Sequence, residues 1–384
     1  MTAPAHVQGR GTARAAHHAS LDGLRAIAVA LVVLFHAGAT SGLPGLLPGG
    51  FVGVSVFFTI SGFLVTSILL RESAGTGSID FGRFWARRVK RLWPASLAVV
   101  TSTVVLASTY WSGMQASDAI AGIFGYTNWH VIWSGEDQLL RTIVGPLGPY
   151  WSLAIEEQFY VLLTVAFVGC LRTARPVRSL TIVVVVGWCG SLLAQLSISG
   201  PQYRLEFGTE TRGSEILAGC GLAILLHRRP DIADRIGRVL APAGCVALAV
   251  IVVIAATNDY DPPWLLHGGY SALSLVSSVL VLSLLVPNRL TSALARRPLA
   301  AIGVASYSIY LIHWPVILIL TPDRVGLDGW GLVAVKVAAA GAAAAVLHLA
   351  IEQPLRRATA ANRTVAGVWI GACLGVTALA LVVL

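Results

Sequence analysis

Eleven long apolar segments divide this sequence, and all but one of them are 17 residues or longer. The hydrocarbon core of a membrane is about 30 Å thick, and about 20 helical residues cross it. Backbone polar groups in lipid must be bonded internally, which favours helices for runs of this length. We therefore predict an all-α, polytopic transmembrane helix bundle of about 10–11 spans. The segments are 24–40, 50–70, 95–112, 150–170, 179–197, 213–227 (the short one), 239–256, 268–286, 299–320, 329–350 and 365–384.

The composition agrees with a membrane protein. Of the 384 residues, 56% are hydrophobic and only 12% are charged. A soluble domain averages about 25% charged residues. This shortage of charge excludes a water-soluble globular domain.

Basic residues alternate between the two sides of the predicted bundle. Twenty-one Lys and Arg residues fall on the side of the N-terminus and four on the opposite side. Such an excess marks the cytoplasmic side, so we expect the N-terminus in the cytoplasm. The net charge of +9 then reflects membrane orientation, and no nucleic acid partner is expected.

Three regions are expected along the chain. Residues 1–20 are basic and lack both acids and apolar runs, which is typical of a disordered cytoplasmic tail. Residues 21–364 form the membrane domain, and 365–384 an additional C-terminal transmembrane helix. The five cysteines lie singly in apolar stretches without metal-ligand spacing, so no metal site is predicted.

The first apolar segment contains a histidine, His36, eleven residues after Arg25. Eleven helical steps make three turns and about 20°, so the two side chains share one face about 16 Å apart along the axis. If Arg25 lies at the membrane rim, His36 is expected near mid-membrane, where ionisable groups are usually functional. The alternative is a polar side chain bonded to a neighbouring helix.

The first large loop on the N-terminal side concentrates arginines before Trp93-Pro94. Arg87, Arg88 and Arg91 are spaced to share one side of a helical turn. Guanidinium groups suit bidentate phosphate binding. The alternative is an anchor attracted to anionic lipid.

The fourth apolar segment opens with two adjacent carboxylates, Glu156 and Glu157. Tyr160 shares the face of Glu156, while Glu157 points elsewhere. Carboxylates in lipid should face a wet cavity or a cation. The functional interpretation is a carboxylate that orients a histidine, and the alternative is an intramembrane ion pair.

Further polar residues interrupt other apolar segments. The second segment is rich in Gly and Ser, which indicates either a tight packing seam or a narrow slot beside Ser61. In the ninth, Pro315 is expected to kink the helix. Arg212 and Glu215 (i,i+3) either bind an acceptor substrate or form an ion pair with each other. The remaining candidates are Tyr307, Tyr310, His313 and Glu352.

Taken in order, these motifs resemble the acyltransferase 3 family of membrane O-acyltransferases. The matching pieces are Leu21–Arg25 through His36, Gly53–Phe58 with Ser61–Leu64, Phe84–Pro94, Tyr150–Tyr160, Ser306–Pro315 and Glu352–Arg356. Many larger members add a soluble esterase-like domain at the C-terminus. This sequence stops after its last apolar segment, so it resembles the stand-alone membrane form.

The resemblance implies a multi-pass enzyme of a bacterial cell membrane. It would move an acyl group from acyl-CoA, either acetyl-CoA or another short acyl-CoA, to a hydroxyl of a carbohydrate, glycolipid or macrolide-type acceptor. The expected partners are this donor, the acceptor and the lipid bilayer, and homo-oligomer formation is left open. Expected catalytic residues are His36 as general base, Arg25, Glu156 and Glu157. Expected donor-binding residues are Arg87, Arg88, Arg91, Ser61, Tyr307 and Glu352, and acceptor-binding residues are Tyr160, Arg212, Glu215, Tyr310 and His313.

One competing class uses the same residue types. Intramembrane His and Glu also form the proton relays of membrane transporters. The sequence shows no inverted repeat, and proton coupling does not need the arginine cluster. A proton-coupled transporter is therefore the alternative to the acyltransferase.

Overall fold

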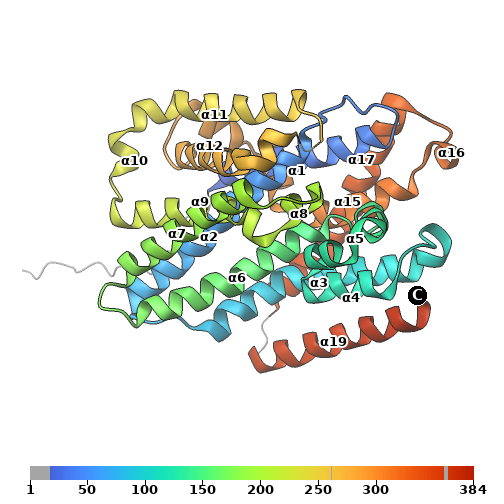
Figure 1. Cartoon of the computed structure of the whole chain (residues 1–384), viewed down its shortest axis with the longest axis horizontal. Coiled ribbons are helices and arrows are strands. Elements are labelled where there is room, and N and C mark those ends of the chain that lie inside the picture. The colour runs from blue at the N-terminus through green and yellow to red at the C-terminus, as the bar shows by residue number, and fades with distance from the viewer. Residues whose placement is uncertain (1–17, 261, 359–361) are drawn as a thin grey trace, which may run out of the picture.

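The structure, a computed structural model, describes residues 18–260, 262–358 and 362–384 (Figure 1). Its regular elements are all helical, with no strand among the described residues. Most of the predicted N-terminal tail, residues 1–17, lies outside the described part. The expected all-α bundle is confirmed.

Each predicted apolar segment coincides with a helix. Nine helices are long and apolar enough to cross a membrane within the described residues, and a bent pair makes a tenth span. The helices that match the prediction are α1 (Ala19–Ala39), α2 (Gly53–Thr76), α3 (Phe81–Tyr110), α6 (Tyr150–Leu171), α7 (Pro176–Ser197), α9 (Thr209–Arg228), α11 (Gly237–Thr257), α12 (Tyr270–Ser283), the pair α14 (Arg297–Val304) and α15 (Ser306–Ile319), α17 (Gly329–Val346) and α19 (Asn362–Val383).

Helix α9 is the predicted short segment. It carries Glu210, Arg212 and Glu215 in its first two turns and is not among the candidate spans. Shorter elements link the long helices: η1 (Gly50–Val52), α4 (Ala116–Phe124), α5 (Thr127–Val144), α8 (Gln202–Phe207), α10 (Ile232–Arg235), η2 (Leu265–Gly269), α13 (Arg289–Leu294), α16 (Pro322–Val325), η3 (Leu347–Glu352) and α18 (Gln353–Arg357).

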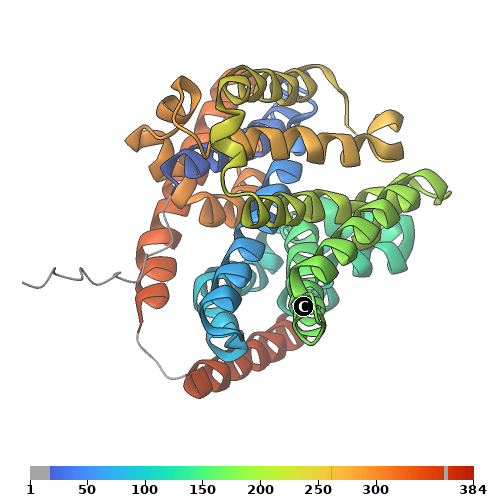
Figure 2. The same ribbon diagram turned by 90° about the vertical axis from the view of Figure 1, so that its left-hand side faces the viewer.

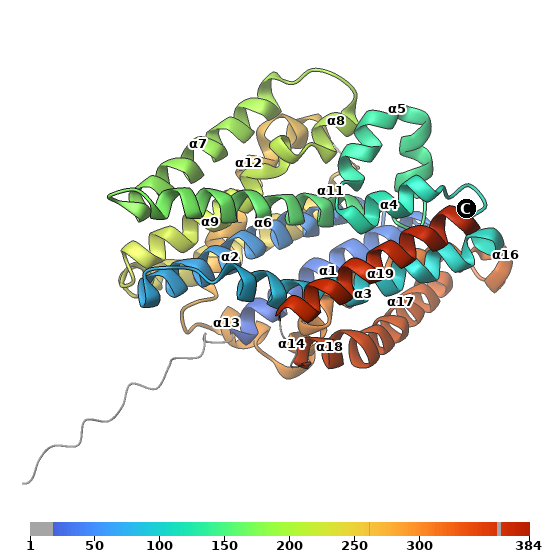
Figure 3. The ribbon, with the colours of Figure 1, turned by 90° about the horizontal axis from the view of Figure 1, so that it is seen from below.

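Burial separates the interior helices from the peripheral ones. The apolar windows of α1 and α2 are 67% and 72% buried, but that of α19 is only 17% buried. Helix α19 lies along α3 at the edge of the bundle (Figures 2 and 3). The two interior helices α1 and α2 therefore carry the residues that other helices surround.

Glycines let the interior helices pack backbone to backbone. A Cβ atom on Gly62 of α2 would lie 1.9 Å from the main-chain oxygen of Ile216 in α9. One on Gly219 of α9 would lie 2.0 Å from the oxygen of Thr59. The small residues of α2 thus form a packing seam, as one of the two interpretations proposed, while Ser61 faces the other way into a cavity.

The ninth span bends at a different place from the one predicted. Helix α15 continues through Pro315, and the 68° bend lies between α14 and α15. Next to this bend, a Cβ on Gly303 would lie 1.7 Å from the main-chain oxygen of Asp22. Close packing of α14 on α1 therefore accompanies the bend.

The two ends of the bundle differ. We call the end at which α1 begins and α2 and α6 finish the N-terminal end; the α6–α7 connection and α10 also lie there (Figure 1). Helices α4, α5 and α16 lie at the opposite end. The cytoplasmic location of the N-terminal end stays a prediction.

Candidate active site

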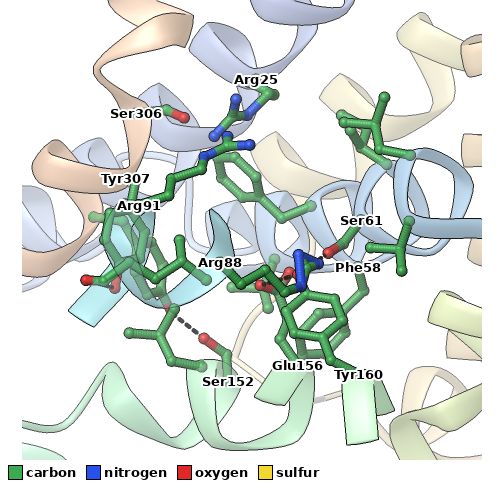
Figure 4. Close-up of a pocket in the computed structure, with 18 of the residues that line it drawn as sticks. Arg25, Phe58, Ser61, Arg88, Arg91, Ser152, Glu156, Tyr160, Ser306 and Tyr307 are labelled. Atoms are coloured by element: carbon green, nitrogen blue, oxygen red, sulfur yellow. Dashed lines mark hydrogen bonds between the residues drawn. The ribbon is translucent and has the colours of Figure 1, made fainter. Parts of the chain in front are cut away.

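A deep cavity lies between α1, α2, α3, α6 and α15 (Figure 4). Its empty volume, including the open space at its mouth, is about 860 Å³. Along α2 its lining runs from Val54 to Ile68, a rise of about 21 Å. The polar lining residues are Arg25, Ser61, Arg88, Arg91, Ser152, Glu156, Tyr160, Ser306, Tyr307 and Tyr310.

The lining of the cavity is most exposed toward the N-terminal end. Ile68, the lining residue of α2 nearest that end, is 39% exposed. At the other end, Phe58, Ser152 and Tyr310 are buried. The Tyr310 hydroxyl bonds Ser152 Oγ at 2.6 Å and donates to the Pro149 carbonyl at 3.2 Å, which closes this end.

The polar lining carries an excess of positive charge. It contains the guanidinium groups of Arg25, Arg88 and Arg91 but a single carboxylate, that of Glu156. The Nε atoms of Arg88 and Arg91 are buried without a hydrogen-bond partner among the described residues. Buried donors of this kind are costly unless a ligand or water satisfies them. The cavity therefore suits an anion.

The rotation of α3 decides which arginines reach this cavity. Asp80 caps the helix by accepting a bond from the Arg83 amide. Arg88 then lies over the ring of Tyr160, with its guanidinium carbon 3.3 Å from the ring centroid. Arg87 instead lies outside the cavity, half exposed and 3.6 Å from the Glu72 carboxylate.

The two glutamates of α6 both line a small pocket between α3 and α6, but they differ in the larger space that each one borders. Glu156 lines the cavity and accepts a hydrogen bond of 3.2 Å from Tyr160, whose hydroxyl also bonds Ser61. Glu157 lines a separate groove between α3 and α6, beside Gly125. Arg88 and Tyr160 line both spaces and form the wall between them.

His36 does not line this cavity. It lies in the last turn of α1, close to the opposite end of the bundle rather than midway along the helix. Its Nδ1 lies 2.9 Å from Nε2 of His313 in α15, and its ring is 4.6 Å from that of Trp314. His313 is one turn beyond Tyr310, so the histidine pair lies just past the closed end of the cavity.

Three further candidates are paired elsewhere. Arg212 and Glu215 form a buried ion pair at 2.6 Å, and the guanidinium lies 3.6 Å from the ring centroid of Tyr270. Glu352 accepts bonds from Ser308 at 2.7 Å and His348 at 2.8 Å. None of the three lines the cavity. Of the fifteen predicted site residues, the structure brings eight together in the cavity: Arg25, Ser61, Arg88, Arg91, Glu156, Tyr160, Tyr307 and Tyr310.

Lys336 is a residue that the motif analysis missed. It is only 1% exposed and donates to the Thr40 carbonyl at 2.7 Å and to the Thr40 hydroxyl at 2.8 Å. It therefore caps the C-terminal turn of α1, which carries His36. The signal was available, because a lone lysine inside an apolar segment usually has a specific partner.

The metal-ligating residue types are dispersed. In the part of the chain that the structure describes, no three His, Cys, Asp or Glu side chains are grouped to hold a metal ion. The five cysteines are all free.

Comparison with known proteins identifies the family. Residues 18–383 match the family model described as "Acyltransferase domain". The chain is 36% identical over 309 residues to the O-acetyltransferase OatA of Staphylococcus aureus, and the aligned region covers 78% of the chain and 50% of OatA. It is 32% identical over 351 residues to the putative peptidoglycan O-acetyltransferase YrhL of Bacillus subtilis, and this alignment covers 88% of the chain and 54% of YrhL. No solved structure matches it.

The chain thus spans about half the length of these curated relatives. The family match nevertheless extends over nearly all of it, from the start of α1 to the end of α19. The transporter alternative gains no support from these comparisons. This multi-pass membrane protein belongs to the acyltransferase 3 family.

Proposed function

We propose that this protein is an O-acetyltransferase of the bacterial cell membrane. It would move an acetyl group from acetyl-CoA to a hydroxyl of a glycan. The observation that carries the proposal is the cationic cavity, with the guanidinium groups of Arg25, Arg88 and Arg91 in its lining, in a chain of the acyltransferase 3 family. The names of OatA and YrhL support acetyl as the acyl group, and that of YrhL supports a glycan as acceptor.

The donor would bind from the N-terminal end of the bundle. Coenzyme A carries several phosphate charges, and Arg25, Arg88 and Arg91 supply the matching guanidinium groups. The more exposed end of the lining lies where basic loops gather, and the positive-inside rule supports a cytoplasmic location for that end. The nucleotide would lie at the mouth, and the thioester arm would extend along α2 toward Tyr310.

The proposed chemistry uses His36 as general base. The acceptor oxygen attacks the thioester carbonyl, so that a carbon–oxygen bond forms and the carbon–sulfur bond breaks. The hydroxyl proton passes to His36 Nε2 and from there to the departing thiolate, which leaves as coenzyme A. Because Tyr310 lies between the cavity and the histidine pair, its side chain has to turn aside for the thioester to arrive. The acceptor would then approach from the opposite end of the bundle.

Arginine variants of α3 test donor binding with a matched control. We expect Arg88→Ala and Arg91→Ala each to weaken coenzyme A binding about tenfold or more, because a charge-assisted hydrogen bond contributes about 1.5–3 kcal/mol. Arg87→Ala removes the same charge from the same helix outside the cavity, and its affinity should stay close to wild type. Calorimetry on purified protein in detergent gives the three dissociation constants.

The pattern of affinities distinguishes the alternatives. Equal, small losses in all three variants would reduce the arginines to a general electrostatic or lipid-anchoring role and contradict the donor site. Unchanged binding in Arg88→Ala and Arg91→Ala would contradict it as well. Higher salt should weaken binding to the wild-type protein, since the contacts are ionic.

A further inference from the structure

We propose that His313 is a positioning residue that sets which ring nitrogen of His36 carries the proton. The inference rests on the proposed function, in which His36 is the general base. It concerns a contact between helices that are far apart in the sequence, the last turn of α1 and the middle of α15. It also gives His313 a role other than binding the acceptor.

The surroundings of His313 fix its own tautomer. Its Nδ1 lies 2.7 Å from the carbonyl oxygen of Tyr310 and 3.2 Å from that of Ile309. Carbonyl oxygens only accept hydrogen bonds, so this Nδ1 must carry the proton. In a neutral imidazole the other nitrogen then has a free lone pair. His313 Nε2 is therefore an acceptor.

The tautomer of His36 follows from that of His313. His36 Nδ1 lies 2.9 Å from the acceptor Nε2 of His313, so it has to donate. The proton of neutral His36 is on Nδ1, and Nε2 keeps its lone pair. Nε2 is the nitrogen left to take a proton from an acceptor hydroxyl.

The same contact suits both charge states of His36. When Nε2 gains a proton, Nδ1 still donates to His313, so no bond breaks during the reaction. His313 is fully buried, and its ring also lies nearly parallel to that of His36, with centroids 5.1 Å apart and planes 20° apart. A buried neutral histidine thus holds the base in one orientation, as the carboxylate of a catalytic triad does for its histidine.

Two substitutions of His313 separate hydrogen bonding from packing. His313→Leu fills the space of the imidazole but offers no hydrogen-bond acceptor, whereas His313→Gln can place an amide oxygen near the former position of Nε2. We expect His313→Leu to lower kcat for acetyl transfer about tenfold or more, and groups that set an imidazole tautomer can account for up to about 10⁴-fold. The KM for acetyl-CoA should change little, because His313 does not line the donor cavity. His313→Gln should recover much of kcat.

A direct measurement does not depend on activity. In protein labelled with ¹⁵N-histidine, nitrogen chemical shifts distinguish a protonated ring nitrogen from a bare one, and comparison with His36→Ala assigns the signals. We expect wild-type His36 to be protonated at Nδ1 and bare at Nε2. The reverse tautomer would overturn the inference even if His313→Leu proves unstable.

The outcomes separate this inference from the proposed function. If His36→Ala still transfers acetyl groups at the wild-type rate, the proposed function fails and the inference with it. If His36→Ala is inactive but His313→Leu keeps wild-type kcat, only the inference fails. Equal impairment of His313→Leu and His313→Gln would also contradict the inference, since a hydrogen-bond acceptor at this position would then make no difference.

Discussion

At the scale of single residues, the neighbours Glu156 and Glu157 should respond differently to loss of charge. Both line one small pocket, but only Glu156 lines the cationic cavity, where it accepts a bond from Tyr160, and only Glu157 lines the groove between α3 and α6. We expect Glu156→Gln to slow single-turnover transfer about tenfold or more, because it weakens a hydrogen bond to a charged group. It should not weaken coenzyme A binding, since it removes a negative charge from an anion site.

Glu157→Gln is the matched control for this prediction. It makes the same change one residue away, outside the cavity that holds the three arginines. Rapid-quench transfer rates and calorimetric affinities should be measured for both variants. Full turnover in both would make the carboxylate pair structural, and weaker coenzyme A binding by Glu156→Gln would argue against donor phosphate in this cavity.

At the scale of helices, the contact between α2 and α9 should depend on Gly62. An alanine Cβ at this position would lie 1.9 Å from a main-chain oxygen, which cannot move aside as a side chain can. We expect Gly62→Ala to destabilise the protein by about 1–3 kcal/mol, the usual cost of overpacking. Gly75→Ala, in the same helix with no atom of a described residue within 4 Å of its Cβ, should unfold at or above the wild-type temperature. Equal melting temperatures in detergent would contradict this contact.

The cap on α1 gives a second prediction at this scale. Lys336→Met leaves the Thr40 carbonyl without its buried donor, at a cost of about 1–3 kcal/mol. Thr40→Val removes only the hydroxyl and should cost less. Because the cap holds the turn that carries His36, Lys336→Met should also lower kcat more than it changes the KM for acetyl-CoA. A loss confined to KM would place Lys336 at the donor site instead.

At the scale of the whole molecule, the two ends of the bundle should face opposite sides of the membrane. Ala174, exposed in the α6–α7 connection, lies at the N-terminal end, and Leu327, beside α16, lies at the opposite end. In a cysteine-free background, an impermeant maleimide should label Leu327→Cys on intact cells. It should label Ala174→Cys only after lysis. The reverse pattern would place the N-terminal end of the bundle outside the cell and contradict donor binding from the cytoplasm.

The sequence predicts some levels of this organisation better than others. Hydropathy locates the long apolar helices because lipid demands long apolar runs, but it does not locate α4 or α5. The i,i+3 spacing already offered the Arg212–Glu215 pair as an alternative. The sequence does not reveal that Arg88 faces the cavity and Arg87 does not, since the rotation of α3 depends on its packing against distant helices such as α15 and α19. The His36–His313 contact joins residues 277 positions apart, which a single sequence without homologues does not connect.

The most direct test of the account is acetyl transfer itself. Purified protein in proteoliposomes would receive acetyl-labelled acetyl-CoA on the side of the arginines and a hydroxylated glycan fragment on the other. The wild type should pass label to the glycan and release coenzyme A in equal amount. His36→Ala should bind the donor normally but transfer roughly 10²–10⁴-fold more slowly, the usual loss when a general base is removed. Transfer by His36→Ala at the wild-type rate would contradict the account. So would the absence of transfer by the wild type to any glycan, macrolide or glycolipid acceptor.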